Sequence, residues 1–188
     1  MGWSLSWIAA KGASPQAVLA AMGLIPTGKR AVSSKSQFSA VELPNGFYLV
    51  RFNRKELPQR KLKEFSKAFN LLYCFAEEHV MYSTVASWHN GEEIWSVVHD
   101  GQEGVTHLVE KGTPPTGFVA IKDRLFAEQK SRGHEDVDCI FDIPVELAAE
   151  LTGYRHDQDV AGMDPNAFEV MEPIKKSVLA RWNPFRKD

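Results

Sequence analysis

Residues 81–100, MYSTVASWHNGEEIWSVVHD, decide the fold because they predict a β-hairpin. Two runs rich in β-branched and aromatic residues flank Asn90-Gly91, and both of these residues tolerate the positive φ angles of a two-residue type I′ turn. Such a turn sets Trp88 opposite Glu93. The register that follows places on one face the alternate residues Tyr82, Thr84, Ala86, Trp88, Glu93, Trp95, Val97 and His99.

This face of the hairpin is the first candidate for a binding surface. Aromatic side chains with a polar tip are enriched where proteins bind their partners. The alternative is that these side chains pack in the core with their polar tips hydrogen-bonded. The candidate binding residues here are Tyr82, Trp88, Trp95 and His99.

The chain before the hairpin predicts the element order β-α-β-β-α-β. Ser14-Pro15 begins the first helix and Gly23 ends it. Residues 26–36 contain no hydrophobic periodicity and are interpreted as a polar loop. This order is typical of the ferredoxin-like, or split-βαβ, fold. We expect strands near residues 3–10, 37–43, 47–53 and 70–77, and helices near residues 15–22 and 58–69.

Further elements are expected after the hairpin: a strand near residues 105–110, helices near residues 118–131 and 144–151, an irregular stretch over 154–165, and a short helix formed by Ile174, Val178 and Trp182. The expected fold class is α+β, with a ferredoxin-like β-α-β-β-α-β core, an extended antiparallel sheet and C-terminal helices. We expect one domain over residues 1–188. Its parts are the split-βαβ core (1–77), the hairpin extension (78–110) and a helical and irregular C-terminal part (115–188).

The cysteines and the hydropathy of the chain indicate a compartment. Cys74 and Cys139 each lie among apolar residues, so we expect two buried, reduced thiols and no disulfide. No apolar stretch is long enough to span a membrane, and the opening MGWSLSWIAAKG lacks the basic start of a secretory signal. We therefore expect a cytoplasmic protein.

Charge is unevenly distributed along the chain. Residues 1–67 carry 11 basic and 3 acidic residues, whereas residues 128–172 carry 3 basic and 12 acidic residues. The last sixteen residues are again basic, with 5 against 1. If the fold keeps these segments apart, the surface has a positive and a negative face that steer a charged partner. The alternative is ordinary solvated surface.

Two groups of titratable residues are candidates for a metal site or for acid–base chemistry. His79, His89, His99 and His107 lack a short-spaced pair, and the expected register puts His89 and His99 on opposite faces, so we expect no metal there. Acidic residues gather in 134–138 and 154–159, where a cation or a cationic partner is a possible ligand. The candidate binding residues in these runs are Asp136, Asp138 and Asp157.

Motifs of the common catalytic and nucleotide-binding classes do not occur in the sequence. It contains no G-x-S-x-G, no H-E-x-x-H and no glycine-rich phosphate loop, so no cofactor is expected. Basic residues surround the second expected helix, but the whole chain is slightly acidic and Asn45-Gly46-Phe47 departs from the RNA-binding pattern. Nucleic acid is therefore not an expected partner.

Several segments together resemble an uncharacterised family of small bacterial cytoplasmic proteins. They are GWSLSW at 2–7, EEHVM at 77–81, IWSV at 94–97, HD at 99–100, FDIP at 141–144 and LTGYRHD at 151–157. The similarity covers nearly the whole chain. It implies a bacterial origin and a single compact domain, and it implies no activity, substrate or catalytic residue.

Two functional hypotheses follow. The first is a non-enzymatic protein-interaction module, of an immunity or regulatory type, that binds a charged partner protein. The second is a metal-dependent hydrolase that gathers the His, Asp and Glu clusters in a cleft. Three or more convergent ligating side chains favour the hydrolase, and an exposed patch without such convergence favours the interaction module.

Overall fold

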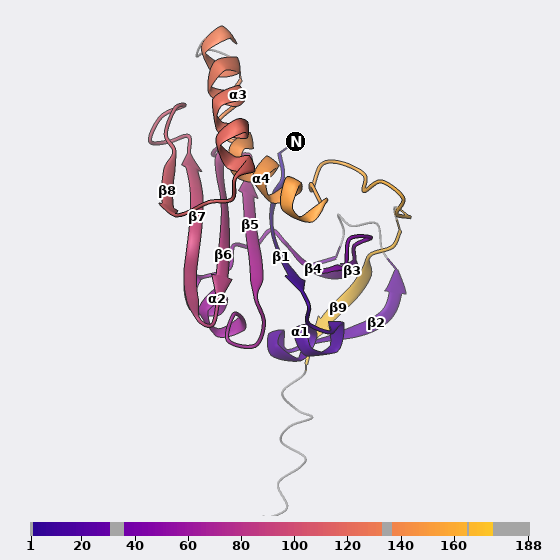
Figure 1. Cartoon of the computed structure of the whole chain (residues 1–188). Coiled ribbons are helices and arrows are strands. Elements are labelled where there is room, and N and C mark those ends of the chain that lie inside the picture. The colour runs from indigo at the N-terminus through magenta and orange to yellow at the C-terminus, as the bar shows by residue number, and fades with distance from the viewer. Residues whose placement is uncertain (1, 31–35, 133–136, 165, 175–188) are drawn as a thin grey trace, which may run out of the picture.

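The computed structural model describes residues 2–30, 36–132, 137–164 and 166–174, which form an α+β fold with one large antiparallel sheet (Figure 1). Its strands are β1 (Ser4–Lys11), β2 (Leu24–Arg30), β3 (Phe38–Glu42), β4 (Phe47–Asn53), β5 (Leu71–Glu77), β6 (Tyr82–His89), β7 (Glu92–Asp100), β8 (Val109–Gly112) and β9 (Glu169–Pro173). Its helices are α1 (Pro15–Met22), α2 (Gln59–Phe65), α3 (Gly117–Arg132) and α4 (Asp142–Thr152). None of these helices is long and apolar enough to cross a bilayer.

The nine described strands are ordered β2-β9-β3-β4-β1-β5-β6-β7-β8, and each strand is antiparallel to its neighbours. The C-terminal part, expected to be helical and irregular, thus contributes β9, which lies between β2 and β3. Ile174 follows this strand, and its N–H donates to the Gly23 carbonyl. The helix expected at Ile174, Val178 and Trp182 lies, beyond Ile174, outside the described residues.

The first part of the chain differs from the expected element order at one place. β2 occupies residues 26–30 of the polar loop expected at 26–36, so the order is β-α-β-β-β-α-β and a ferredoxin-like core is not established. An edge strand explains the missed periodicity, because only Leu24 among its residues is buried. Extra strands on both sides of β3, β4, β1 and β5 also make the sheet much larger than that fold requires.

Both faces of the sheet carry a hydrophobic core. On the face that we call the α3/α4 face, Trp7, Cys74 and Val85 pack with residues of α3 and α4. On the opposite, α1/α2 face, Ile8 and Tyr73 pack with residues of α1 and α2. In Figure 1, α3 and α4 lie at the upper end of the molecule, and α1 and α2 at the lower end.

The local signals for α1 and for the thiols are confirmed. Ser14 Oγ accepts a hydrogen bond from the Ala17 N–H at 3.2 Å, and Gly23 ends α1 with a left-handed φ of 67°. Cys74 and Cys139 are both buried and unpaired. Burial raises the pKa of each thiol, which keeps both protonated and poorly reactive.

The hairpin forms as expected at its turn but changes register beside it. Asn90 and Gly91 have φ angles of 50° and 84°, and Trp88 pairs with Glu93. Ser87 then pairs with Trp95, so Ile94 is an extra residue in β7 and forms a β-bulge.

The bulge reverses the faces of most of β7, because side chains alternate along a strand. Tyr82 and Trp88 face the α1/α2 side, whereas Trp95 packs in the core of the α3/α4 side. His99 pairs with Ser83 and lies on that same α3/α4 side. The expectation that all four candidate residues share one face is therefore wrong.

One buried charge lies in the α3/α4 core. Arg51 of β4 is 2% exposed, its guanidinium carbon lies 5.2 Å from the centre of the Phe168 ring, and its Nη2 has no hydrogen-bond partner. No carboxylate among the described residues forms an ion pair with it. A desolvated cation–π contact contributes roughly 2 kcal/mol, whereas burial of a charge costs several kcal/mol. A side-chain hydrogen bond between Arg51 and Tyr154 offsets part of this cost.

A candidate binding groove on the α1/α2 face

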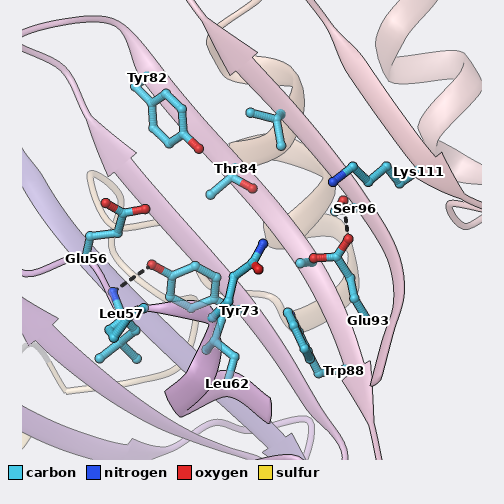
Figure 2. A pocket seen from close by; sticks show the side chains of 14 residues that line it. Glu56, Leu57, Leu62, Tyr73, Tyr82, Thr84, Trp88, Glu93, Ser96 and Lys111 are labelled. Carbon is cyan, nitrogen blue, oxygen red and sulfur yellow. Dashed lines mark hydrogen bonds between the residues drawn. The ribbon is translucent and has the colours of Figure 1, made fainter. Parts of the chain in front are cut away.

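A hollow of about 280 Å³ lies on the α1/α2 face, between the hairpin strands, α2 and the connection from β4 to α2. We call it the sheet groove (Figure 2). Its aromatic residues are Tyr73, Tyr82 and Trp88, and its polar and charged residues include Glu56, Thr84, Glu93, Ser96 and Lys111. Tyr82 and Trp88 are thus the two hairpin candidates that the structure brings together in one site.

The bulge at Ile94 creates this hollow. Without the extra residue, Trp95 and Val97 would face the groove; with it, Ser96 and Val98 do. A serine and a valine fill less space than a tryptophan and a valine. The same register shift that moves Trp95 into the core therefore leaves room on the opposite face.

Tyr73 fixes one wall of the groove. Its hydroxyl accepts a hydrogen bond from the Leu57 N–H at 3.1 Å, which ties the connection between β4 and α2 to the sheet. Burial is the main reason why the pKa of Tyr73 lies far above its usual value, and the charge of Glu56 adds to it. The phenol therefore stays neutral and has a structural role.

The electrostatics of the groove are dominated by carboxylates. Burial, and after it the negative charges of Glu56 and Asp100, raise the pKa of Tyr82. Glu93 accepts a hydrogen bond from Ser96 Oγ at 3.0 Å, and in the described part of the chain neither Glu56 nor Lys111 forms an ion pair. Two carboxylates against one ammonium leave the groove negative.

The chemistry of the groove suits an organic cation. Carboxylates attract a guanidinium or ammonium group, and aromatic faces add a cation–π attraction. Figure 2 shows Glu56 on one side of the groove and Glu93 with Lys111 on the other. The indole N–H of Trp88 is buried without a hydrogen-bond partner, so this ring is held by packing alone.

The other hairpin candidate, His99, has a structural partner on the α3/α4 side. Its side chain is fully buried, with Nδ1 2.7 Å from the His107 carbonyl oxygen and Nε2 2.8 Å from Asp138 Oδ2. The second oxygen of Asp138 accepts from the N–H groups of Ile140 and Phe141, each at 3.1 Å. Asp138 thus fixes the turn that leads into α4, and Asp136 lies outside the described residues.

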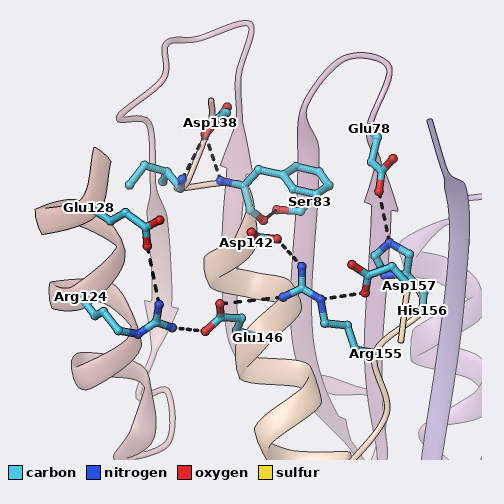
Figure 3. A network of polar contacts seen from close by, with 12 residues as sticks. Glu78, Ser83, Arg124, Glu128, Asp138, Asp142, Glu146, Arg155, His156 and Asp157 are labelled. Carbon is cyan, nitrogen blue, oxygen red and sulfur yellow. Dashed lines mark hydrogen bonds and ion pairs between the residues drawn. The ribbon is translucent and has the colours of Figure 1, made fainter. Parts of the chain in front are cut away.

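The acidic segment 154–159 also contacts other parts of the fold through ion pairs (Figure 3). Arg155 donates from Nε to Asp157 Oδ1 at 2.8 Å and from Nη2 to Asp142 Oδ1 at 2.7 Å. Burial pushes the pKa of Asp157 upward, but the hydrogen bond and charge of Arg155 outweigh it and hold the pKa below its usual value. Asp157 therefore anchors its loop to α4.

The histidines are placed differently from the expectation. The bulge puts His89 and His99 on the same face, so the argument that separated them by face is wrong, but they lie at opposite ends of the hairpin. Among the residues that the structure describes, no group of three His, Cys, Asp or Glu side chains is close enough to hold a metal ion.

Sequence reasoning placed Glu93 on the hairpin face of Tyr82 and Trp88 but missed the other charged residues of the groove. Glu56 follows β4 and Lys111 lies on β8, so no local spacing joins them to the hairpin face. Comparison of the chain with family models, curated proteins and solved structures finds no match. The similarity to a family of small bacterial proteins therefore stays a prediction.

Proposed function

We propose that the protein is a non-enzymatic interaction module that binds a cationic segment of a partner protein in the sheet groove. The observation that carries this proposal is the pair of carboxylates, Glu56 and Glu93, beside aromatic side chains in one hollow. Its volume of about 280 Å³ is slightly below that of typical small-molecule pockets, roughly 300–1,000 Å³. A hollow of this size suits an anchoring side chain of a larger partner.

An immunity or regulatory role in the bacterial cytoplasm is consistent with this chemistry. Such proteins act by occupying a surface of their partner, and complementary charge speeds the encounter. A protein segment with Arg or Lys supplies both the charge for Glu93 and the apolar stem for Trp88. No specific observation supports nucleic acid as the partner, because the groove is negative.

The metal-dependent hydrolase requires His, Asp and Glu side chains that converge on one cleft. The structure instead pairs the candidate residues within the fold: His99 with Asp138, and Asp157 with Arg155. These pairs give His99, Asp138 and Asp157 a role in stabilising the fold. We therefore propose no catalytic role for them.

A charged probe peptide tests the proposal. Hexa-arginine labelled with a fluorophore is titrated with the protein, and its affinity is measured by fluorescence anisotropy at several salt concentrations. The double variant E56Q/E93Q is expected to bind about tenfold more weakly, a difference of about 1.4 kcal/mol. The matched control is E92Q/E103Q, which removes two exposed carboxylates outside the groove.

The control decides between specific and general attraction. If E92Q/E103Q weakens binding as much as E56Q/E93Q does, the affinity depends only on the net charge of the protein and the proposed site is wrong. If only the two groove glutamates affect the affinity, a photo-cross-linking residue is placed at a position next to Glu93. The cross-linked product then identifies the natural partner in the source cell.

A further inference from the structure

The sheet groove adjoins a second, larger hollow of about 1,010 Å³. Tyr82, which lines the groove, pairs with Glu77, which lines the second hollow. Glu56 of the groove and Arg54 of the second hollow lie on the same connection after β4. The two hollows therefore lie next to each other.

The second hollow is lined by one arginine, Arg54, and one carboxylate, Glu77. Glu77 is engaged locally: its Oε1 lies 2.6 Å from His79 Nδ1 and accepts the His79 N–H at 3.2 Å. Arg54 is exposed, and within the described residues it forms no ion pair. An anionic group that enters this hollow therefore meets an unpaired guanidinium.

The backbone holds Arg54 in place. Its φ of 53° lies in the left-handed region, which residues other than glycine rarely adopt. Its N–H donates to the Ser4 carbonyl at 2.8 Å, so the start of β1 fixes this conformation. Strained residues of this kind concentrate at functional sites.

We infer that Arg54 binds an acidic side chain of the same partner segment whose basic side chain enters the sheet groove. This inference rests on the proposed function and gives the bound segment a direction. Neighbouring residues of a strand are about 3.3 Å apart, so the stretch from Trp88 to Tyr82 spans about 20 Å. An extended partner segment that follows this stretch therefore separates its basic and acidic residues by about six positions at most.

Selection from a displayed library of random dodecapeptides tests the inference. The immobilised wild-type protein is expected to enrich peptides with a basic and an acidic residue at a fixed spacing. In one enriched peptide, replacing the acidic residue by alanine should weaken binding about tenfold, and R54Q should do the same. The two changes together should weaken it no further, because they remove one interaction.

Two variants separate the possible failures. The control R60Q removes an exposed arginine from α2 and should leave binding unchanged within about twofold. If E56Q/E93Q weakens the peptides but R54Q and the acidic residue have no effect, the inference is wrong and the proposed function stands. If E56Q/E93Q has no effect either, or if no cationic peptide is enriched, both are wrong.

The charge-reversed variant R54E provides a second measurement. Selection on R54E should replace the acidic position of the enriched peptides by a basic one at the same spacing. An unchanged motif would overturn the inference even if R54Q lowers affinity through a change in folding. Thermal unfolding of each variant, followed by circular dichroism, reports on that change.

Discussion

His99 Nε2 lies 2.8 Å from Asp138 Oδ2, and this contact joins the end of β7 to the turn before α4. The other ring nitrogen faces the His107 carbonyl oxygen, which can only accept a hydrogen bond. Both nitrogens of the imidazole therefore have a hydrogen-bond partner, the carbonyl oxygen of His107 and the carboxyl group of Asp138. His99 is fully buried, so this pair fastens α4 to the sheet from within.

Two substitutions of Asp138 separate its charge from its role in the turn. We expect Asp138→Asn to lower the free energy of unfolding by about 3 kcal/mol, because the buried His99 loses its carboxyl partner. Asp138→Ala should cost about 1 kcal/mol more, because it also removes the acceptor for Ile140 and Phe141. Urea denaturation measures both. A loss below about 1 kcal/mol for Asp138→Asn would show that the carboxyl group contributes little through its contact with His99.

The sequence predicted the turn of the hairpin because Asn90 and Gly91 meet a local backbone requirement. It did not predict the bulge, because the single extra residue, Ile94, carries no signal of its own in the alternation of side chains. One residue was enough to assign Trp95 and His99 to the wrong face. The turn was therefore predictable from local residue types, whereas the set of residues on each face of the hairpin was not.

The candidate site was likewise predictable only where its residues are close together in the sequence. Tyr82 and Trp88 were found because they lie on one strand with a clear period of two. Glu56 and Lys111 come from segments far apart in the chain and meet only through the sheet order. β9 was missed for a related reason: five residues of mixed polarity become a strand because β2 and β3 flank them.

Gly112 supports the bulge from the neighbouring strand, and its substitution tests this contact. It pairs with Trp95 at a φ of 67°, and an added Cβ would lie 2.2 Å from the Ile94 carbonyl oxygen. We expect Gly112→Ala to lower the free energy of unfolding by about 3 kcal/mol, combining backbone strain with this clash. Thermal or urea unfolding measures the loss.

The matched control for this substitution is Gly162→Ala. Gly162 has a similar φ of 76°, but an added Cβ would meet no atom within 4 Å. Only the backbone strain remains in this variant, so we expect the free energy of unfolding to fall by about 1 kcal/mol. Equal losses for the two variants would show that the carbonyl of Ile94 moves aside freely.

His156 makes stability depend on pH. Its side chain is 2% exposed, and burial lowers its pKa below the usual value of about 6.5, although Asp157 and Glu78 act in the opposite direction. Below about pH 6.5 the unfolded chain binds a proton before the folded protein does. The free energy of unfolding should therefore fall as the pH falls through 6.5, until the folded-state pKa is reached.

His156→Gln should remove this part of the pH dependence. The urea midpoints of the wild type and the variant are compared between pH 7.5 and pH 5, and the difference between them isolates His156. The pKa of Asp157 is lowered from a value near 4, so its titration lies below this range. If the urea midpoints of the two proteins change with pH in parallel, the pKa of His156 is the same in the folded and the unfolded chain.

Arg51 and Arg155 should respond in opposite ways to the same substitution. Arg51→Met keeps a long apolar stem beside Phe168 and removes a buried charge that lacks a carboxylate partner. We expect the free energy of unfolding to stay the same or to rise by up to about 2 kcal/mol. Arg155→Met should lower it by about 2 kcal/mol, because Asp142 and Asp157 lose their shared cation. Urea denaturation at pH 7 measures both variants, and a clear loss of stability in Arg51→Met would mean that the contacts of the arginine with Phe168 and Tyr154 outweigh the cost of burying its charge.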